Sequence, residues 1–280
     1  MIKVDGLHVE RSGRTILTDI NFTVAAGSFV AVVGPNGSGK STLLKALTGE
    51  VGIAAGDVEL QGQPLSYWVR RPRASARWRA VVAQTLPVPI AFTALDIVLM
   101  GRTPHNQGKL RREDLEMCRR MLVQMEAEHL SDRRMETLSG GERQRVHIAR
   151  ALAQIHERGV SPQAPLLFLD EATANLDILH QLRVLEIATE LKRSGATVFF
   201  VIHDLGQAMR FADQVLLLEN GKLLASGDPR AALSSANIEQ AFHVQAEWVS
   251  HNGVELLSSK LSKAPLLPSP PQLNKTYEPS

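Results

Sequence analysis

The chain has 280 residues, enough for one large domain or two small ones at roughly 100–200 residues each. Hydrophobic residues make up 44% and charged residues 21%, which is ordinary for a soluble globular protein and indicates no particular function. A net charge of +2 is too small to indicate a nucleic-acid partner, and a single cysteine, Cys118, excludes an internal disulfide. We expect no exported or membrane-spanning segment, because no apolar run has the length of a signal peptide core or the ~20 residues that cross a bilayer.

The first third of the chain predicts several strands and one helix. Apolar periodicity predicts strands at 2–9, 20–24 and 28–33, a helix at 40–47, and further strands at 57–61 and 79–83. The third strand stops at Gly34, so a strand leads into a glycine-rich loop. The pattern up to this point is mixed α/β.

The middle of the chain, residues 84–153, changes character. It carries helical spacing at 112–127 and again after Ser139, with little strand signal, which favours a helical insertion. Three short apolar strands follow, separated by two helical patterns; the strands are at 166–169, 197–202 and 214–219, and the helices at 178–193 and 205–211. Such alternation predicts a parallel sheet covered by helices on both faces.

The last part of the chain predicts a hairpin and then a tail. Asn220-Gly221 is a two-residue hairpin signal. Residues 258–280 are rich in Ser, Pro and Lys, a composition that predicts disorder. We therefore expect one domain over residues 1–257, with a helical subdomain at about 85–153, and a disordered tail beyond it.

The loop from Gly34 to Thr42 has the pattern Gly34-x4-Gly39-Lys40-Ser41, in which backbone N–H groups cradle phosphates. It follows a predicted strand and opens a predicted helix, whose N-terminus favours an anion. The alternative is a glycine-rich turn with a chance lysine, but a cation at the positive end of a helix dipole is unfavourable without an anion beside it. We expect ATP to be bound by Gly34, Pro35, Asn36, Gly37, Ser38, Gly39, Lys40, Ser41 and Thr42.

Two carboxylates, Asp170 and Glu171, end the apolar strand at 166–169. Successive residues at a strand end point to opposite sides, so one carboxylate can hold magnesium while the other polarises a water. We assign Asp170 to the metal and Glu171 to the base. The alternative is that both residues merely cap the next helix, and the nearby phosphate loop favours the catalytic assignment.

A third motif, LSGGERQR, begins at Leu138 and precedes a helical run. Ser139 and Glu142 form a capping-box pattern, which needs no ligand. It does not explain Gly140 and Gly141, which each cost about 1 kcal/mol of helix propensity relative to alanine. Glycines there suit a backbone that a ligand approaches closely, so we expect a second phosphate-contacting helix terminus.

These motifs together resemble those of ABC cassettes, over about residues 1–245. LSGGERQR looks like the ABC signature, Gln84 like the Q-loop glutamine, Asp177 in ANLD like the D-loop aspartate, and His203 in VIHDL like the switch histidine. The resemblance implies an α/β fold: a P-loop NTPase cassette with a RecA-like core, an N-terminal antiparallel β subdomain and an inserted α-helical subdomain.

The resemblance also implies a mechanism in which two cassettes pack head to tail as a homodimer and trap ATP between them. Magnesium would be held by Ser41, Gln84 and Asp170. The signature of the other copy would close over the γ-phosphate, and the implied ATP contacts outside the phosphate loop are Ser139, Gly140, Gly141, Glu142 and Asp177. The catalytic group would be Glu171 with His203 and Gln84, the last linking the metal to the helical insertion.

Two departures from the family pattern stand out. ABC cassettes usually place an aromatic residue near position 11 to stack on adenine, and this chain has Arg11, Ser12 and Gly13 there. The Arg11 guanidinium is the candidate replacement, because its plane can stack on a base. Ala172 replaces the usual proline after the catalytic glutamate, and we expect little consequence.

Within the family, the chain resembles importer ATPases of the metal-chelate group, which serve hemin, iron-siderophore and cobalamin permeases. The stretches 92–98 and 100–105 are similar to those ATPases, and residues 86–108 are the candidate permease contact. An extension at 154–164 looks like that of hemin-importer ATPases, so hemin is the expected cargo and siderophores or cobalamin the alternatives. The implied partners are two transmembrane permease subunits and, through them, a periplasmic binding protein, with the chain on the cytoplasmic side of the inner membrane.

Two other classes of protein remain open as alternatives. A run of arginines with interleaved aromatics could bind a nucleic-acid backbone, although a solvated helix and loop is the better interpretation and we expect no nucleic-acid partner. The run comprises Arg70, Arg71, Arg73, Arg77 and Arg79 with Tyr67, Trp68 and Trp78. A small-molecule P-loop kinase would keep the loop at Gly34 but has no use for LSGGE or for His203.

Overall fold

The computed structural model describes residues 1–84, 91–106, 109–156, 163–251 and 254–261. Its centre is a six-stranded sheet in the order β10-β9-β3-β8-β7-β6. The strands are β3 (Phe29–Val33), β6 (Arg79–Val82), β7 (Leu166–Leu169), β8 (Thr197–Val201), β9 (Gln214–Glu219) and β10 (Lys222–Gly227). β10 pairs antiparallel with β9 across the turn at Asn220-Gly221, and the other pairs are parallel, which confirms the predicted sheet and hairpin.

Both faces of this sheet are covered, and the core strands are buried along their whole length. In β3, Phe29, Ala31 and Val33 face one hydrophobic cluster and Val30 and Val32 face another, as the two-residue period of a strand requires. The first cluster joins the sheet to the helical part of the molecule, and the second joins it to the N-terminal strands. The continuous apolar runs in the sequence are therefore strands buried on both sides.

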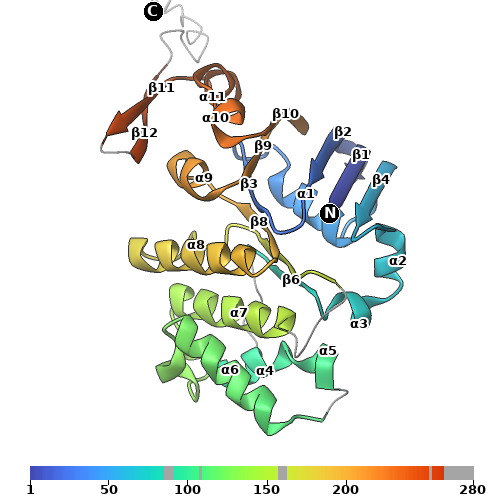
Figure 1. Cartoon of the computed structure of the whole chain (residues 1–280), viewed down its shortest axis with the longest axis vertical. Coiled ribbons are helices and arrows are strands. Elements are labelled where there is room, and N and C mark those ends of the chain that lie inside the picture. The colour runs from blue at the N-terminus through green and yellow to red at the C-terminus, as the bar shows by residue number, and fades with distance from the viewer. Residues whose placement is uncertain (85–90, 107–108, 157–162, 252–253, 262–280) are drawn as a thin grey trace, which may run out of the picture.

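The N-terminal strands form a separate four-stranded antiparallel sheet, β2-β1-β4-β5, which lies at the upper right of Figure 1. Its members are β1 (Ile2–Arg11), β2 (Arg14–Val24), β4 (Ala55–Leu60) and β5 (Gln63–Pro64). Helix α1 (Lys40–Thr48) packs beneath it within the second cluster. Two short helices, α2 (Leu65–Val69) and α3 (Pro72–Ser75), lead from this sheet to β6.

The helical subdomain lies at the bottom of Figure 1, away from the N-terminal sheet. It contains α4 (Ala94–Met100), α5 (Thr103–Asn106), α6 (Arg112–Gln124) and α7 (Gly140–Ile155). The helix expected over 112–127 stops at Gln124, because Glu126 adopts a φ of 52° that no helix continues. Inside the subdomain the Arg102 guanidinium and the Asp114 carboxylate form a buried ion pair, with Nε 3.0 Å from Oδ1.

Helices α8 (Ile178–Arg193) and α9 (Leu205–Phe211) complete the core where the sequence predicts them. Beyond β10 come α10 (Pro229–Ala232) and α11 (Ser235–Phe242), then a two-stranded antiparallel ribbon of β11 (Val244–His251) and β12 (Val254–Leu261). The ribbon corrects the expected boundary: residues 258–261 belong to a strand, so the ordered chain passes residue 257. The rest of the expected tail, 262–280, lies outside the described residues. Over the described ranges, none of the helices has both the length and the apolar content to cross a membrane.

Candidate functional site

The phosphate loop connects β3 to α1 and lines a pocket of about 480 Å³. A Cβ on Gly34, whose φ is 144°, would lie 2.2 Å from the carbonyl oxygen of Leu218, so no side chain fits there. Gly39, at φ 102°, would bring a Cβ to 2.6 Å from Leu17 Cδ2. The loop therefore needs glycine at both ends, and its residues Asn36 to Thr42, Ser38 excepted, line the pocket.

Lys40 lies at the N-terminus of α1, beneath the loop. Its Nζ donates hydrogen bonds of 2.9 Å to the carbonyl oxygens of Gly34 and Pro35. Burial lowers the pKa of Lys40, and the carboxylates of Glu171 and Asp170 oppose that shift. A buried cation at the positive end of a helix is stabilised by an anion beside it, and the phosphates of a nucleotide would supply that anion.

Ser41 and Asp170 meet at the carboxyl ends of the sheet strands. Ser41 Oγ donates a 2.9 Å hydrogen bond to Asp170 Oδ1, and Asp170 is only 4% exposed. Burial raises the pKa of Asp170, while the Ser41 hydroxyl and nearby lysines lower it. A hydroxyl and a carboxylate are hard oxygen ligands, so this pair fits Mg²⁺, which uses few protein ligands when a nucleotide supplies the rest.

Glu171 is the centre of the catalytic group predicted from the sequence. Gln84 Nε2 donates to Glu171 Oε2 at 2.5 Å, and His203 Nε2 lies 2.9 Å from Glu171 Oε1. Glu171 has a φ of 49°, in the left-handed region that residues other than glycine rarely adopt. Such backbone conformations are concentrated at functional sites. The ends of three strands, β6, β7 and β8, thus bring Gln84, Glu171 and His203 together as expected.

The predicted site residues divide into two groups in space. The phosphate pocket is lined by Asn36, Gly37, Gly39, Lys40, Ser41, Thr42, Gln84, Glu171, His203 and Ile16. The signature residues do not line it: Ser139 and Gly140 are exposed at the N-terminus of α7, in the helical subdomain. One copy of the chain therefore carries both halves of the expected ATP site, but at separate places: the phosphate pocket and the signature at the start of α7.

The signature helix begins with a complete capping box. Ser139 Oγ accepts from the Glu142 N–H at 3.2 Å, and Glu142 Oε2 accepts from the Ser139 N–H at 2.7 Å. These hydrogen bonds lower the pKa of Glu142. A Cβ on Gly141 would lie 2.9 Å from the carbonyl oxygen of Asn175, so that glycine is needed for close packing against the loop before Asp177. The glycines of the motif thus have a partly structural cause.

Ile16 is a pocket residue that the sequence analysis missed. It is half-buried in β2 and lines the phosphate pocket, whereas Arg11 is exposed and does not line it. A Cβ on Gly221 would lie 2.2 Å from the carbonyl oxygen of Ile16, so this strand is held tightly beside the loop. An apolar residue shortly after Arg11 was the only signal available, and strand packing alone explains such a residue.

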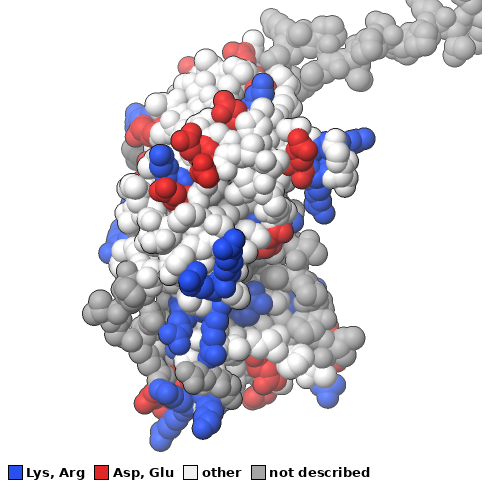
Figure 2. Space-filling model, turned by 90° about the vertical axis from the view of Figure 1, so that its right-hand side faces the viewer, with Lys and Arg blue, Asp and Glu red and all other residues white. Residues whose placement is uncertain are grey.

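The arginine run covers part of the surface over α2, α3 and α5. Figure 2 views this side and shows Lys and Arg side chains gathered across its middle. Arg73 and Arg77 donate to the carbonyl oxygen of Pro104, at 3.5 and 3.1 Å, and so tie the segment to the helical subdomain. Trp68 and Trp78 are 6% and 2% exposed, which leaves them unable to stack on bases. The two tryptophans of the run are core residues, whereas Tyr67 is 37% exposed and its ring lies under the Arg71 guanidinium.

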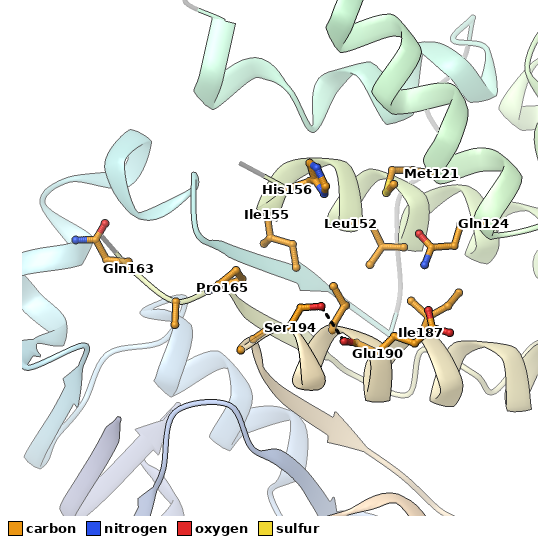
Figure 3. Close-up of a pocket in the computed structure, with 14 residues that line it drawn as sticks. Met121, Gln124, Leu152, Ile155, His156, Gln163, Pro165, Ile187, Glu190 and Ser194 are labelled. Atoms are coloured by element: carbon orange, nitrogen blue, oxygen red, sulfur yellow. Dashed lines mark hydrogen bonds between the residues drawn. The ribbon is translucent and has the colours of Figure 1, made fainter. Parts of the chain in front are cut away.

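A second pocket, of about 600 Å³, lies between α6 and α7 on one side and α8 on the other (Figure 3). Leu152 and Ile155 face Ile187 across it. His156 and Gln163, near the two ends of the extension at 154–164, also line this pocket. Residues 157–162 of the extension lie outside the described residues. The extension therefore leaves and rejoins the fold at the seam between core and helical subdomain, away from the phosphate loop.

Comparison with known proteins agrees with this geometry. A family model described as "ABC transporter" matches residues 17–174. A relative from Gloeobacter violaceus named "Hemin import ATP-binding protein HmuV" is 43% identical over 252 residues, covering 90% of this chain and 90% of the relative. Another of that name, from Nocardia farcinica, is 44% identical over 255 residues and covers 89% and 85%.

Solved structures show the same architecture. One described as an inward-facing putative metal-chelate type ABC transporter aligns with a TM-score of 0.76 and 29% identity, over 94% of this chain and 98% of that one. Another, described as the dimeric post-hydrolysis state of an ATP-binding cassette with ADP and Pi, aligns with a TM-score of 0.72 and 25% identity, over 82% and 99%.

Proposed function

The chain belongs to the ABC transporter family and is the ATP-binding and ATP-hydrolysing cassette of an importer, and we propose that its cargo is hemin. The observation that carries the cargo is the similarity to relatives named for hemin import along nearly their whole length. The extension at 154–164, which resembles that of hemin-importer ATPases, supports it. Iron-siderophore and cobalamin import are the alternatives within the same group.

The placement of the signature supports a site shared between two cassettes. Ser139 and Gly140 are exposed and do not line the phosphate pocket, which supports a second copy as their source for an ATP held at Lys40. Directly after Asp177, the side chains of Ile178 and Leu179 are 77% and 66% exposed. Apolar surface in water is unfavourable, and burial against a partner would remove that free-energy cost. ATP binding and dimer closure are then one event.

Residues of the loop would hold the nucleotide before reaction. Its N–H groups and the Lys40 ammonium bind the phosphates, with Lys40 exchanging its carbonyl partners for phosphate oxygens. Ser41, Asp170 and Gln84 would hold Mg²⁺, which when bound neutralises charge on the phosphates. Ile16 packs against the nucleotide on the side of the pocket formed by β2.

Glu171 then acts as the general base. Its carboxylate takes a proton from a water as the water oxygen bonds to the γ-phosphorus, and the bond from that phosphorus to the β–γ bridging oxygen breaks. The products are ADP and phosphate. Gln84 and His203, which bond the two carboxylate oxygens, orient Glu171 until the water and γ-phosphate enter. His203 lines the phosphate pocket, so it would contact the γ-phosphate afterwards.

We place the chain on the cytoplasmic side of the inner membrane, bound to two permease subunits that receive cargo from a periplasmic binding protein. Residues 86–108 are the proposed permease contact. Their described part, 91–106, carries α4 and α5, and Phe92 and Met100 there are 42% and 40% exposed. Apolar side chains exposed beside the Q-loop suit a partner that must follow movement at Gln84.

Transport by the intact complex tests the cargo. The complex is purified from native membranes through a tag on this chain, reconstituted in proteoliposomes, and given hemin, an iron-siderophore or cobalamin with the matching binding protein. We expect ATP-dependent uptake of hemin alone, and none from a complex carrying Glu171→Gln. Uptake of a siderophore or cobalamin instead would replace the cargo and keep the importer. Failure to recover any membrane partner would contradict import itself.

A further inference from the structure

His180 lies between two carboxylates from different parts of the fold. Its Nδ1 is 2.8 Å from Asp177 Oδ1, and its Nε2 is 3.8 Å from Glu126 Oε2. Because an ionised carboxylate can only accept, Nδ1 donates to Asp177, and Nε2 attracts Glu126 when it is protonated as well. The side chain is 20% exposed and is the link from the start of α8 to the end of α6.

Glu126 is itself fixed by the signature helix. It follows α6 with a φ of 52°, and Arg145 Nη1 donates to its carbonyl oxygen at 2.6 Å. Arg145 is a residue of α7, is 8% exposed, and also reaches the carbonyl oxygen of Met125 at 3.3 Å. A continuous series of polar contacts therefore runs from Asp177 through His180 and Glu126 to the helix that begins with the signature.

The first turn of α8 also holds the loop that precedes this helix. Gln181 Nε2 donates to the carbonyl oxygens of Thr173 and Leu176, at 3.2 and 3.0 Å. These bonds fix the loop backbone but leave the Asp177 side chain, 66% exposed, to His180. Within the described part of the chain, the hydrogen bonds to the Asp177 carboxylate come from the backbone N–H and the imidazole of His180.

Helix capping accounts for only part of this arrangement. An N-cap aspartate needs the backbone N–H of His180, which donates to Asp177 Oδ1 at 2.9 Å. The imidazole bond and the contact with Glu126 go beyond capping, because they orient the carboxylate and join two subdomains. We propose that His180 is a positioning residue that aims the Asp177 carboxylate and, through Glu126, makes its position follow the helical subdomain.

The inference rests on the proposed function, in which Asp177 works at a site closed by a second copy. Movement of the signature helix on ATP binding would shift Glu126 through Arg145, and His180 would carry that shift to Asp177. Loss of His180 should then slow turnover without weakening the first binding of ATP, because Lys40 and its loop do not contact it.

The test compares three variants of the full chain in steady-state ATP hydrolysis. We expect His180→Ala to lower kcat about 10-fold while the KM for ATP changes less than about 2-fold. His180→Asn keeps an N–H that can reach Asp177 and should recover most of kcat, and Glu126→Gln should lose about 3-fold. His129→Ala is the matched control, since His129 is an exposed histidine of the same subdomain region.

Thermal midpoints of the same variants separate positioning from folding. A purely structural histidine would lower the midpoint and leave kcat per folded molecule unchanged, which would overturn the proposal. So would a wild-type kcat in His180→Ala, or an Asn variant as slow as the Ala variant. A Glu171→Gln chain in the same assay distinguishes the failures: full turnover there contradicts the proposed function, whereas lost turnover with a normal His180→Ala contradicts this inference alone.

Discussion

Helices α1 and α7 both begin at glycine-rich motifs, but their N-termini are capped differently. The N-cap of α1 is Gly39, in a left-handed conformation with no side-chain cap. The N-cap of α7 is Ser139, with a complete capping box to Glu142. The first helix begins at the phosphate pocket with no side-chain cap, whereas in the second the Ser139 hydroxyl accepts from the Glu142 N–H.

This difference suits the proposed roles, in which the first motif binds phosphate within one copy of the chain and the second needs another copy. Open N–H groups and the Lys40 ammonium form a concentrated positive region, which an anion can fill within one copy of the chain. At α7 the Glu142 carboxylate already offsets the helix dipole. In the proposed mechanism the signature would contribute by shape, through the exposed Gly140, when another copy brings a phosphate to it.

The largest expected effect comes from Glu171→Gln. This variant should keep the phosphate loop of one copy and the signature of the other together around unhydrolysed ATP. Removing the base should lower kcat by about 10²–10⁴-fold, because the amide cannot accept a proton from water. ATP binding survives, since Lys40 and the loop are untouched, so the variant should form a dimer with ATP and Mg²⁺. Turnover is measured by phosphate release and dimerisation by analytical ultracentrifugation.

The matching control is Lys40→Ala in the Glu171→Gln background. It removes the cation from the open helix end and should abolish the ATP-dependent dimer. A dimer that forms equally without ATP, or that survives loss of Lys40, would show that the two helix ends do not depend on a shared nucleotide, and the comparison between them would fail.

A smaller effect concerns acid stability of the signature helix, through buried His147. Burial lowers the pKa of His147 from 6.5 to about 4, helped by Arg150 and Arg143. Between those values the unfolded chain binds a proton that the folded chain does not, so stability falls as the pH is lowered from 6.5 to 4. The loss is roughly 3 kcal/mol at 1.36 kcal/mol per pKa unit.

The measurement is denaturant unfolding at pH 7 and pH 4.5 for the wild type and for His147→Gln. The variant should lose less stability over that interval, because it has no proton to bind in the unfolded chain. Equal losses of unfolding free energy in both proteins would mean that His147 is not the group responsible. The signature helix would then not be the source of the acid sensitivity.

Much of the phosphate site could be predicted because each part is encoded locally. A strand, a glycine-rich loop and a helix are consecutive in the sequence. Gln84, Glu171 and His203 each come two residues after the end of a strand, β6, β7 and β8 respectively. Parallel strands place their carboxyl ends together, so the sequence already implies that these side chains meet.

Contacts between distant segments could not be predicted in the same way. Ile16 enters the pocket because β2 packs beside Gly221, a neighbour 205 positions away that no periodicity reveals. The Arg102–Asp114 pair and the His180–Glu126 contact depend on how helices pack. The β11–β12 ribbon was missed because its second strand, VELLSSKL, does not alternate apolar and polar residues and is largely exposed.

The smallest expected effect sharpens the comparison at α7 itself. Glu142→Ala removes half of the capping box and should lower the free energy of unfolding by about 1 kcal/mol at pH 7. Glu142→Gln can still accept from the Ser139 N–H, so it should stay close to the wild type. Denaturant unfolding of the three proteins measures both.

Acid distinguishes the charge of Glu142 from its shape. The pKa of Glu142 is lowered from 4.5 by its bonds with Ser139, so its ionised contribution is present above pH 4.5 and is lost as the pH falls through the lower, folded value. Glu142→Gln should lack that loss. If Gln instead costs as much as Ala at pH 7, the exposed pair with Arg133, at 3.4 Å, would be the stabilising contact. The signature helix would then keep the Ser139 hydroxyl as its N-cap and gain its further stability from that ion pair, so its N-terminus would still differ from the uncapped start of α1.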